Sequence, residues 1–343
     1  MSDGLRRWLQ KAGGELGPSD ARNLSATEAS SVWDSLVEDD ADSVLIGSFF
    51  TALRSKGASS DELVGFARAA RRRIQFPELP TGAVVLGTSR LGKKNHPPLG
   101  LAAAAAAVAS GTPVLIQSAP HAAGEGVTLA DLWERAVGPV LEDSVAVSEE
   151  IEAHGMACWR PTSADSSWEV LLSIEDRMGL RSLPDIVCKL LAPPASRVLV
   201  ASRPGPVLAL AGDTLAALGH ENGIVMQGIE GSVDPAVSVS TRGMELHSGG
   251  KSPLRLEPGD FGLACASEPP QMHEERVEAA VLAQEEALLN TEGPALACVL
   301  LGAALMLRLG GRTQDIAEGV TLAREAIESG KAGSILERLK KFD

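Results

Sequence analysis

The segment from Gly87 to His96 contains the residues whose types and spacing could do chemistry. It reads Gly-Thr-Ser-Arg-Leu-Gly-Lys-Lys-Asn-His and follows a short apolar run, so it forms a polar loop after a predicted buried strand. Its three cations precede a predicted helix that opens at Pro97-Pro98, where free amides and the helix dipole also favour an anion. We therefore expect a phosphate-bearing ligand to be bound by Gly87, Thr88, Arg90, Lys93, Lys94 and Asn95.

A second group of cations lies just before this loop. Residues 54–94 contain nine Lys and Arg against three Asp and Glu, although the whole chain carries a net charge of −14. One interpretation of the Arg71–Arg73 triplet is a solvated helix end, where cations suit the dipole. The other interpretation is contact with nucleic-acid phosphates, although the overall acidity of the chain argues against a protein covered with nucleic acid. The candidate residues for that contact are Arg54, Lys56, Arg71, Arg72 and Arg73.

The remaining motifs indicate no catalytic residue and no metal site. Gly249-Gly-Lys-Ser252 resembles the end of a phosphate-binding P-loop, but it lacks the first glycine and the strand-to-helix context, so a hairpin turn is favoured. In that hairpin, Val237–Val239 and Met244–His247 are the predicted strands. The four cysteines form no CxxC pair, and the six histidines are widely spaced.

The composition favours a cytoplasmic protein. The start, Met1-Ser-Asp-Gly-Leu5, has no apolar signal region, and no run approaches 18 apolar residues, so neither secretion nor a membrane partner is expected. Isolated cysteines suit a reducing compartment. Aromatic residues make up 3% of the chain and tyrosine is absent, which removes the usual platform for stacking bases.

The pattern of elements predicts two domains. Capping boxes at Ser25/Glu28 and Ser59/Glu62 precede apolar residues at helical spacing, so residues 1–80 form a small helical domain, which we expect helices near 166–192 to join. Residues 83–343 alternate short apolar strands with helices, which is typical of an α/β fold with a mostly parallel sheet. The predicted strands are Ala83–Leu86, Pro113–Gln117, Arg197–Ala201 and Gly223–Met226, and the tail from about residue 273 is helical.

Several segments resemble one known family along nearly the whole chain. Leu24–Ala29, Phe50–Gly57 and the Asp61-Glu-Leu-Val-Gly-Phe segment resemble the small helical domain of the anthranilate phosphoribosyltransferases. Asp260-Phe-Gly-Leu263 and Gly319–Gly330 are similar to that family's late signature and last long helix. The resemblance implies the nucleoside phosphorylase and phosphoribosyltransferase class of fold, a phosphoribosyltransferase-like domain over 83–343, and a second copy of the chain as a partner.

The family's active-site motifs are replaced here. The family binds phosphoribosyl diphosphate with Gly-Thr-Gly-Gly-Asp, Asn-x-Ser-Thr and Lys-His-Gly-Asn segments, and magnesium with an Asp-Glu pair. Their counterparts in this chain are Ser89–Leu91 for Gly-Gly-Asp, Pro97-Pro98 for the hydroxyls, Gln117–Pro120 for the Lys-His segment and Val233-Asp234 for the acidic pair. Glu175 stands where the family has the arginine that holds the anthranilate carboxylate.

Each replacement works against the family's reaction. Side chains in place of glycines obstruct a diphosphate, and proline donates neither hydroxyl nor amide. Magnesium bridging a diphosphate prefers carboxylates, and one is missing. A glutamate repels a carboxylate substrate, so we expect that anthranilate is not the acceptor.

A subgroup of the family fits these replacements better. Asn95-His-Pro-Pro-Leu99, Arg177–Ser182 and Cys188–Pro193 resemble the YbiB-like paralogues of the second type, whose catalytic motifs are eroded. That resemblance implies a dimer built on the small helical domains and a basic groove that binds nucleic acid with little sequence preference.

Two hypotheses from different classes follow. In the first, the chain is a binding module without cofactor or catalytic residue, whose partners are its second copy and DNA, RNA or a phosphorylated small molecule. In the second, it is an active phosphoribosyl or glycosyl transferase with a changed acceptor, and only then would it use Mg²⁺. A scaffold that only dimerises is a third possibility.

Overall fold

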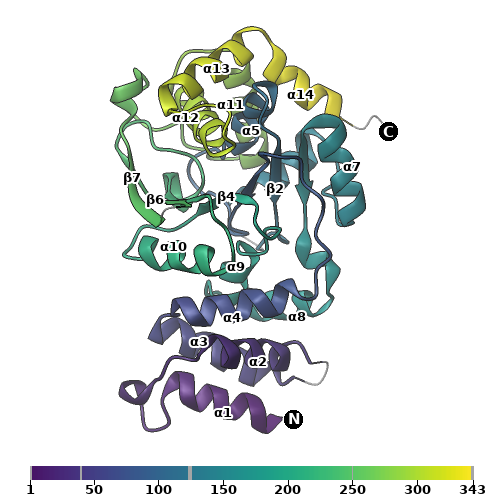
Figure 1. Ribbon diagram of the computed structural model, residues 1–343, viewed down its shortest axis with the longest axis vertical. Coiled ribbons are helices and arrows are strands. Elements are labelled where there is room, and N and C mark those ends of the chain that lie inside the picture. Colours follow the sequence, from purple (N-terminus) through teal and green to yellow (C-terminus); the bar gives the residue numbers. More distant parts are fainter. Residues whose placement is uncertain (1, 39–40, 123–125, 249, 341–343) are drawn as a thin grey trace.

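The structure is a computed structural model that describes residues 2–38, 41–122, 126–248 and 250–340. A helical lobe formed by the N-terminal residues lies at one end and a larger α/β lobe at the other (Figure 1). The helical lobe holds α1 (Ser2–Gly13), α2 (Ala26–Leu36), α3 (Ser43–Lys56) and α4 (Ser60–Arg71). Both predicted capping boxes are confirmed at the starts of α2 and α4. Trp33, Phe49 and Phe66 pack in the core of this lobe.

The α/β lobe is built on one sheet of seven strands in the order β3-β2-β1-β4-β5-β6-β7. The first five strands in that order run parallel, and β6 and β7 form an antiparallel hairpin at one edge. The predicted α/β fold with a mostly parallel sheet is therefore confirmed. The strands are β1 (Val84–Gly87), β2 (Val114–Gln117), β3 (Met156–Trp159), β4 (Arg197–Ala201), β5 (Gly223–Gln227), β6 (Thr241–His247) and β7 (Gly250–Leu256).

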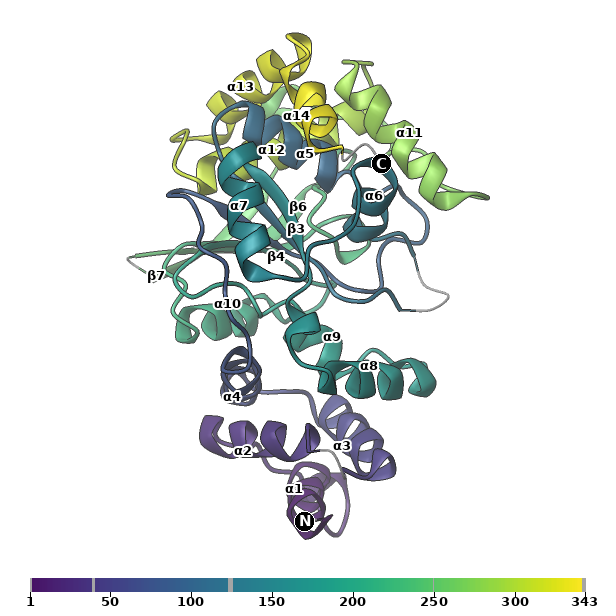
Figure 2. The ribbon, with the colours of Figure 1, turned by 90° about the vertical axis from the view of Figure 1, so that its right-hand side faces the viewer.

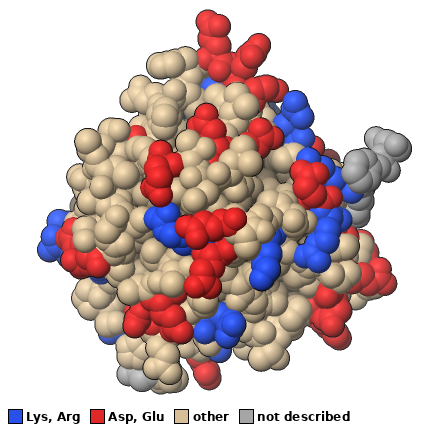
Figure 3. All heavy atoms as spheres, turned by 90° about the horizontal axis from the view of Figure 1, so that it is seen from above, with Lys and Arg blue, Asp and Glu red and all other residues tan. Residues whose placement is uncertain are grey.

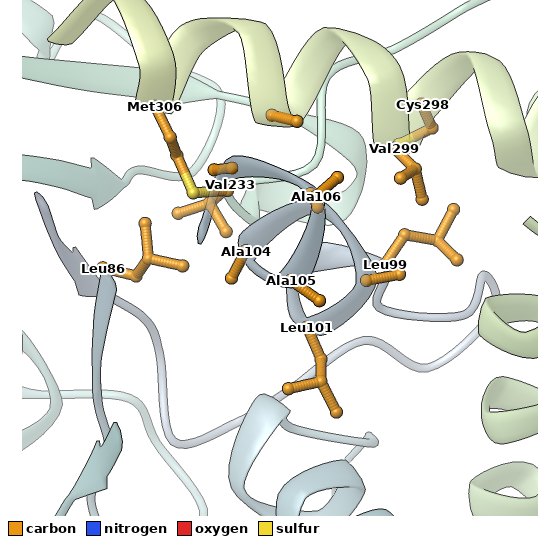
Figure 4. Close-up of a cluster of buried hydrophobic side chains, with 14 of the residues drawn as sticks. Leu86, Leu99, Leu101, Ala104, Ala105, Ala106, Val233, Cys298, Val299 and Met306 are labelled. Atoms are coloured by element: carbon orange, nitrogen blue, oxygen red, sulfur yellow. The ribbon is translucent and has the colours of Figure 1, made fainter. Parts of the chain in front are cut away.

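An alanine-rich helix forms the centre of the upper core. α5 (Gly100–Ala109) packs between the sheet and α12 (Pro294–Leu309), and its short side chains let the two helices approach closely (Figure 4). A Cβ on Gly302 of α12 would lie 3.1 Å from the Cβ of Ala103, which shows how tight this contact is. The other helices of the lobe are α6 (Leu129–Ala136), α7 (Ser144–His154), α11 (Arg276–Leu288), α13 (Ile316–Glu328) and α14 (Lys331–Leu339).

Three helices of the α/β part of the chain lie against the helical lobe (Figure 2). They are α8 (Ser167–Met178), α9 (Leu183–Cys188) and α10 (Leu208–Ala217). α8 contacts α3, and both α9 and α10 contact α4. The buried guanidinium of Arg71 adds a fixed link, because it donates hydrogen bonds to the carbonyl oxygens of Ala192 and Leu218 at 2.7 and 3.3 Å. The 3₁₀ turns lie at Pro18–Asp20, Pro161–Ala164, Ile229–Gly231 and Pro258–Phe261.

Two local predictions were wrong. The helix after the polar loop begins at Gly100 and not at Pro97-Pro98. Each proline disfavours the helical conformation in the residue that precedes it. In the hairpin, Met244–His247 does belong to β6, but its partner is β7 after the turn, and Val237–Val239 forms bends. Gly250, Lys251 and Ser252 lie in β7, as a hairpin requires and a P-loop does not, and Gly249 lies outside the described residues.

Among the described residues, no helix is both long enough and apolar enough to cross a lipid bilayer.

The close contact between α2 and α4 predicts a test of the helical lobe. A Cβ on Gly65 would lie 2.2 Å from the carbonyl oxygen of Ala26, so Gly65→Ala forces the two helices apart. We expect a loss of about 1–3 kcal/mol in the free energy of unfolding, measured in urea. The control is Gly333→Ala on α14, where a Cβ meets nothing within 4 Å and the change should be neutral or stabilising. Equal stability of the two variants would contradict this packing.

Candidate functional site

The polar loop after β1 lies where the carboxyl ends of the parallel strands meet, which is where α/β folds place ligands. Gly87 ends β1 against the backbone of Lys189, so closely that a Cβ would lie 2.8 Å from the carbonyl oxygen. The Oγ1 atom of Thr88 lies 3.4 Å from the carbonyl oxygen of Gln117 at the end of β2. The loop faces residues 228–234 after β5, and the cavity between them measures only about 40 Å³.

Arg90 points away from this cavity and into the protein. Its side chain is 1% exposed and its Nη1 atom lies 3.1 Å from Glu175 and 2.7 Å from Asp176, both on α8. Its Nε atom also donates to the carbonyl oxygen of Pro120. Burial alone would lower the pKa of Arg90, but the hydrogen bond and charge of Asp176 outweigh it, so the pKa is raised. The guanidinium is therefore charged and already paired, which leaves it unavailable to a phosphate.

Glu175 is the centre of the same buried network. Its Oε1 atom accepts hydrogen bonds from the backbone and hydroxyl of Ser182, and Oε2 faces Arg90. Burial, together with the nearby Asp185 carboxylate, raises the pKa of Glu175. Asp185 itself accepts from Ser89 and Arg181; burial opposes its charge, but Arg181 and Lys189 lower its pKa overall. Glu175, which the sequence resemblance matches to the arginine that holds the anthranilate carboxylate, is thus held in an ion pair.

Lys93 is buried as well and forms a second internal ion pair. Its Nζ atom lies 2.9 Å from a carboxylate oxygen of Asp234 and donates to the carbonyl oxygen of Pro97. The same oxygen of Asp234 accepts a hydrogen bond from the amide of Leu99, just before α5. The side chain of Gln284 accepts from the amide of Ala102 in the first turn of that helix. The chain's own side chains therefore bond both of these amides at the start of α5.

Glu230 fills the remaining anion-binding position. Its carboxylate accepts hydrogen bonds from three consecutive backbone amides, those of Lys94, Asn95 and His96, at 2.9, 3.1 and 2.7 Å. The Asn95 side-chain amide donates to it at 3.3 Å. Successive amides that converge in this way form an anion-binding concavity. Glu230 reaches it from a left-handed backbone conformation with φ of 56°, which is uncommon outside glycine.

The second group of cations is dispersed over the helical lobe. Lys56 pairs with the buried Glu62 at 2.8 Å, Arg72 with Asp34 at 3.1 Å, and Arg73 with Asp165 of the loop before α8. Arg71 is the buried link between lobes, and its pKa is lowered to about 10 by burial and by Arg68. Arg54 alone of the group lines a cavity, at the junction of the lobes. Lys56, Arg71, Arg72 and Arg73 are therefore each bonded to a different partner within the protein.

Of the four cations that converge, Arg54 was singled out from the sequence and the other three were not. Arg181 and Arg203 line both the small cavity behind the polar loop and a larger one at the lobe junction, where Arg54 and Lys189 join them. Isolated arginines in otherwise unremarkable segments give no local signal. Arg181 lies just before α9 and Arg203 just after β4, and the fold brings both beside the polar loop.

The residues present do not fit the family's magnesium diphosphate. The one retained carboxylate, that of Asp234, is 3% exposed and bonded to Lys93, so a cation already neutralises it. The described residues contain no group of three or more His, Cys, Asp or Glu side chains able to hold a metal ion.

Comparisons with known proteins agree with the fold and its family. Residues 97–333 match the model of the glycosyl transferase family α/β domain, and residues 16–74 match that of its helical bundle domain. The chain therefore belongs to glycosyltransferase family 3. Among its relatives are anthranilate phosphoribosyltransferases from Rubrobacter xylanophilus, 29% identical over 97% of this chain and 96% of the relative, and from Solibacter usitatus, 27% identical over 94% and 95%.

Solved structures show the same architecture. Anthranilate phosphoribosyltransferase from Thermus thermophilus superposes with a TM-score of 0.80 at 22% identity over 98% of both chains. The enzyme from Saccharomyces cerevisiae, in complex with PRPP and Mg, superposes with a TM-score of 0.80 at 16% identity, over 99% of this chain and 97% of that one. At these identities the likeness concerns the fold.

The Arg90–Glu175 pair predicts a pH-dependent loss of stability. Arg90→Met leaves the Glu175 carboxylate buried without its cation, and we expect a cost of about 3–5 kcal/mol at pH 7.5 in urea unfolding. The pKa of Glu175 is already raised and rises further without Arg90. A raised carboxyl pKa means stability that is present at low pH and lost as pH rises, so the deficit should shrink at pH 5.5.

Two controls accompany this measurement. The double variant Arg90→Met/Glu175→Gln should be more stable than Arg90→Met, because no buried charge remains unpaired. Arg135→Met breaks an exposed pair with Glu278 and should cost less than about 1 kcal/mol at both pH values. A deficit independent of pH would show that Glu175 is not the group left unpaired.

Proposed function

We propose that this chain is a family member that has lost phosphoribosyl transfer to anthranilate and acts by binding a polyanion, with DNA or RNA as its partner. The observation that carries the first part is the Glu230 carboxylate on the amides of residues 94–96. The predicted phosphate-binding loop is closed by the protein's own acids, in line with the resemblance to the YbiB-like paralogues.

The closure affects every part of a diphosphate site. Ser89, Arg90 and Leu91 replace the glycines and acid of the family's loop, and Arg90 is held by α8. Asp234 is held by Lys93, and the backbone amides are held by Glu230. A diphosphate would have to displace at least one carboxylate and leave a buried cation or amide to find a new partner, which costs about 1–3 kcal/mol per group.

Positive charge remains at the junction of the lobes. We define the basic rim as Arg54, Arg181 and Arg203, which line one cavity there, and of these Arg54 and Arg203 are exposed. The far face of the α/β lobe, by contrast, shows acidic and basic side chains interspersed (Figure 3). The rim therefore supports phosphate contacts better than that face does. A homodimer, as the family resemblance implies, would present the rim twice.

The proposed rim contacts predict salt-dependent binding of nucleic acid. Single-stranded DNA titrated at 50 and 200 mM salt should bind more weakly at the higher salt, because released counterions drive the association. Arg54→Glu/Arg203→Glu should weaken binding at least tenfold and reduce the salt slope by about 2. Arg255→Glu on β7, an exposed arginine outside the rim, is the matched control.

The titration also separates the alternatives. Unchanged binding in the rim variant would refute the rim as the contact surface. In another outcome, the wild-type protein binds no DNA and yet releases heat on titration with a phosphorylated small molecule. If the rim variant loses that heat, the partner is the small molecule.

The Glu230 contact predicts a gain of binding on mutation. Glu230→Ala removes the internal anion and frees three amides, so we expect pyrophosphate to bind at least tenfold more tightly than to the wild-type protein, measured by calorimetry. Glu221→Ala, which removes an exposed acid before β5, should leave the wild-type affinity unchanged. Tight wild-type binding of phosphoribosyl diphosphate with Mg²⁺ would instead favour the transferase with a changed acceptor.

A further inference from the structure

A cavity of about 370 Å³ lies behind the basic rim, between the helical lobe and the sheet. Its apolar walls come from six elements: α3, α4, α9, β4, α10 and β5. The residues that form them include Leu53, Leu63, Ile186, Leu190, Val200 and Leu210. This volume falls in the range of small-molecule sites, which are mostly apolar with a few polar groups that fix the ligand.

The charges of this cavity are one-sided. Arg54, Arg181, Arg203 and Lys189 line it, and no acidic side chain is among the described residues that do so. Arg181 is neutralised in part by Asp185. Arg54 and Arg203 are exposed, so Lys189 is the buried cation of this lining, in an apolar space where an uncompensated charge is costly.

Lys189 is the most deeply placed of these cations. Its residue is 7% exposed, and its Nζ atom donates to the carbonyl oxygen of Ala201 at 3.2 Å. In the described part of the chain, no carboxylate lies within ion-pair distance of this Nζ atom. The ammonium carries three N–H donors, and the carbonyl oxygen of Ala201 accepts from one of them. The charge of Asp185 acts on this ammonium at longer range, but Asp185 is bonded to Arg181, so Lys189 has no carboxylate of its own.

We propose that this cavity binds a small amphipathic carboxylate, whose apolar body fills the space between the lobes and whose anionic end pairs with Lys189. The single buried ammonium of Lys189 matches one negative charge, and the leucine, isoleucine and valine walls match an unbranched or aromatic hydrocarbon body. This site goes beyond the proposed polyanion contact, because it uses the interior of the cavity and stands whether or not nucleic acid binds at the rim.

The cavity is also distinct from the position of the family's acceptor carboxylate. That position corresponds to Glu175, which is bonded to Arg90 and Ser182 and does not line this cavity. Lys189 instead faces β4, on the other side of β1 from the Gln117–Pro120 segment.

The protonation of Lys189 provides a second way to detect its pairing with a bound carboxylate. Burial and the charge of Arg181, opposed by the charge of Asp185, lower the pKa of Lys189 to about 8, so the amine is partly neutral in weakly basic solution. A bound carboxylate would favour the charged form and raise this pKa. Binding near pH 8 should therefore take up protons, and the affinity should fall as pH rises above 8.

The test uses decanoate as the probe and the full chain, with calorimetry at pH 7, 8 and 9. Decanoate should bind at micromolar to millimolar concentrations, and Lys189→Met should weaken it at least tenfold. Decyltrimethylammonium, which has the same chain length and the opposite charge, should not bind. Proton uptake at pH 8, measured in buffers of different ionisation enthalpy, should disappear in Lys189→Met.

Several results would overturn the proposal: no decanoate binding at millimolar concentration, equal binding of decanoate and decan-1-ol, or full binding by Lys189→Met. Should Lys189→Met fail to fold, Leu63→Trp, which fills the cavity and keeps the lysine, must abolish binding. Lys331→Met on α14 is the matched control and should bind decanoate as the wild type does. Because neither Lys189 nor Leu63 belongs to the basic rim, a failure here leaves the DNA titration unaffected.

Discussion

The hydrogen bonds from the amides of Lys94, Asn95 and His96 to the Glu230 carboxylate determine what the site between the lobes can bind. Three converging amides are a ready site for a phosphate, and here a tethered carboxylate occupies them. The Arg90–Glu175 and Lys93–Asp234 pairs are similar, because in each of them a buried cation is bonded to a buried carboxylate of the same chain. Inside a protein these charges stabilise one another only as pairs, so an incoming anion has to displace a carboxylate that is already bonded.

The fold could be predicted from the sequence because it depends on local patterns. Capping boxes marked α2 and α4, and short apolar runs marked β1, β2, β4 and β5 to within a residue or two. The hairpin was harder to predict. β7 contains Lys251 and Pro253, and its polar and apolar residues alternate weakly, so its sequence alone resembles a loop. Its strand structure depends on pairing with β6.

The position of the polar loop could be predicted from the sequence, but the pairing of its cations with buried acids could not. The types and spacing of Arg90 and Lys93 suggested free cations, and both are buried against acids that lie 85 and 141 residues further along the chain. Ion pairing over such separations depends on how strands are ordered in the sheet. For the same reason Lys189 and Arg203 escaped notice: their shared cavity exists only where α9, β4 and the helical lobe meet.

Amide hydrogen exchange at residues 94–96 tests the closed loop most directly. If Glu230 holds these amides, Lys94, Asn95 and His96 should exchange slowly, and millimolar phosphoribosyl diphosphate with Mg²⁺ should not change their rates. Exchange at the rate of free amides, or strong additional protection on adding the diphosphate, would show that the loop is open to a phosphate and would contradict the account.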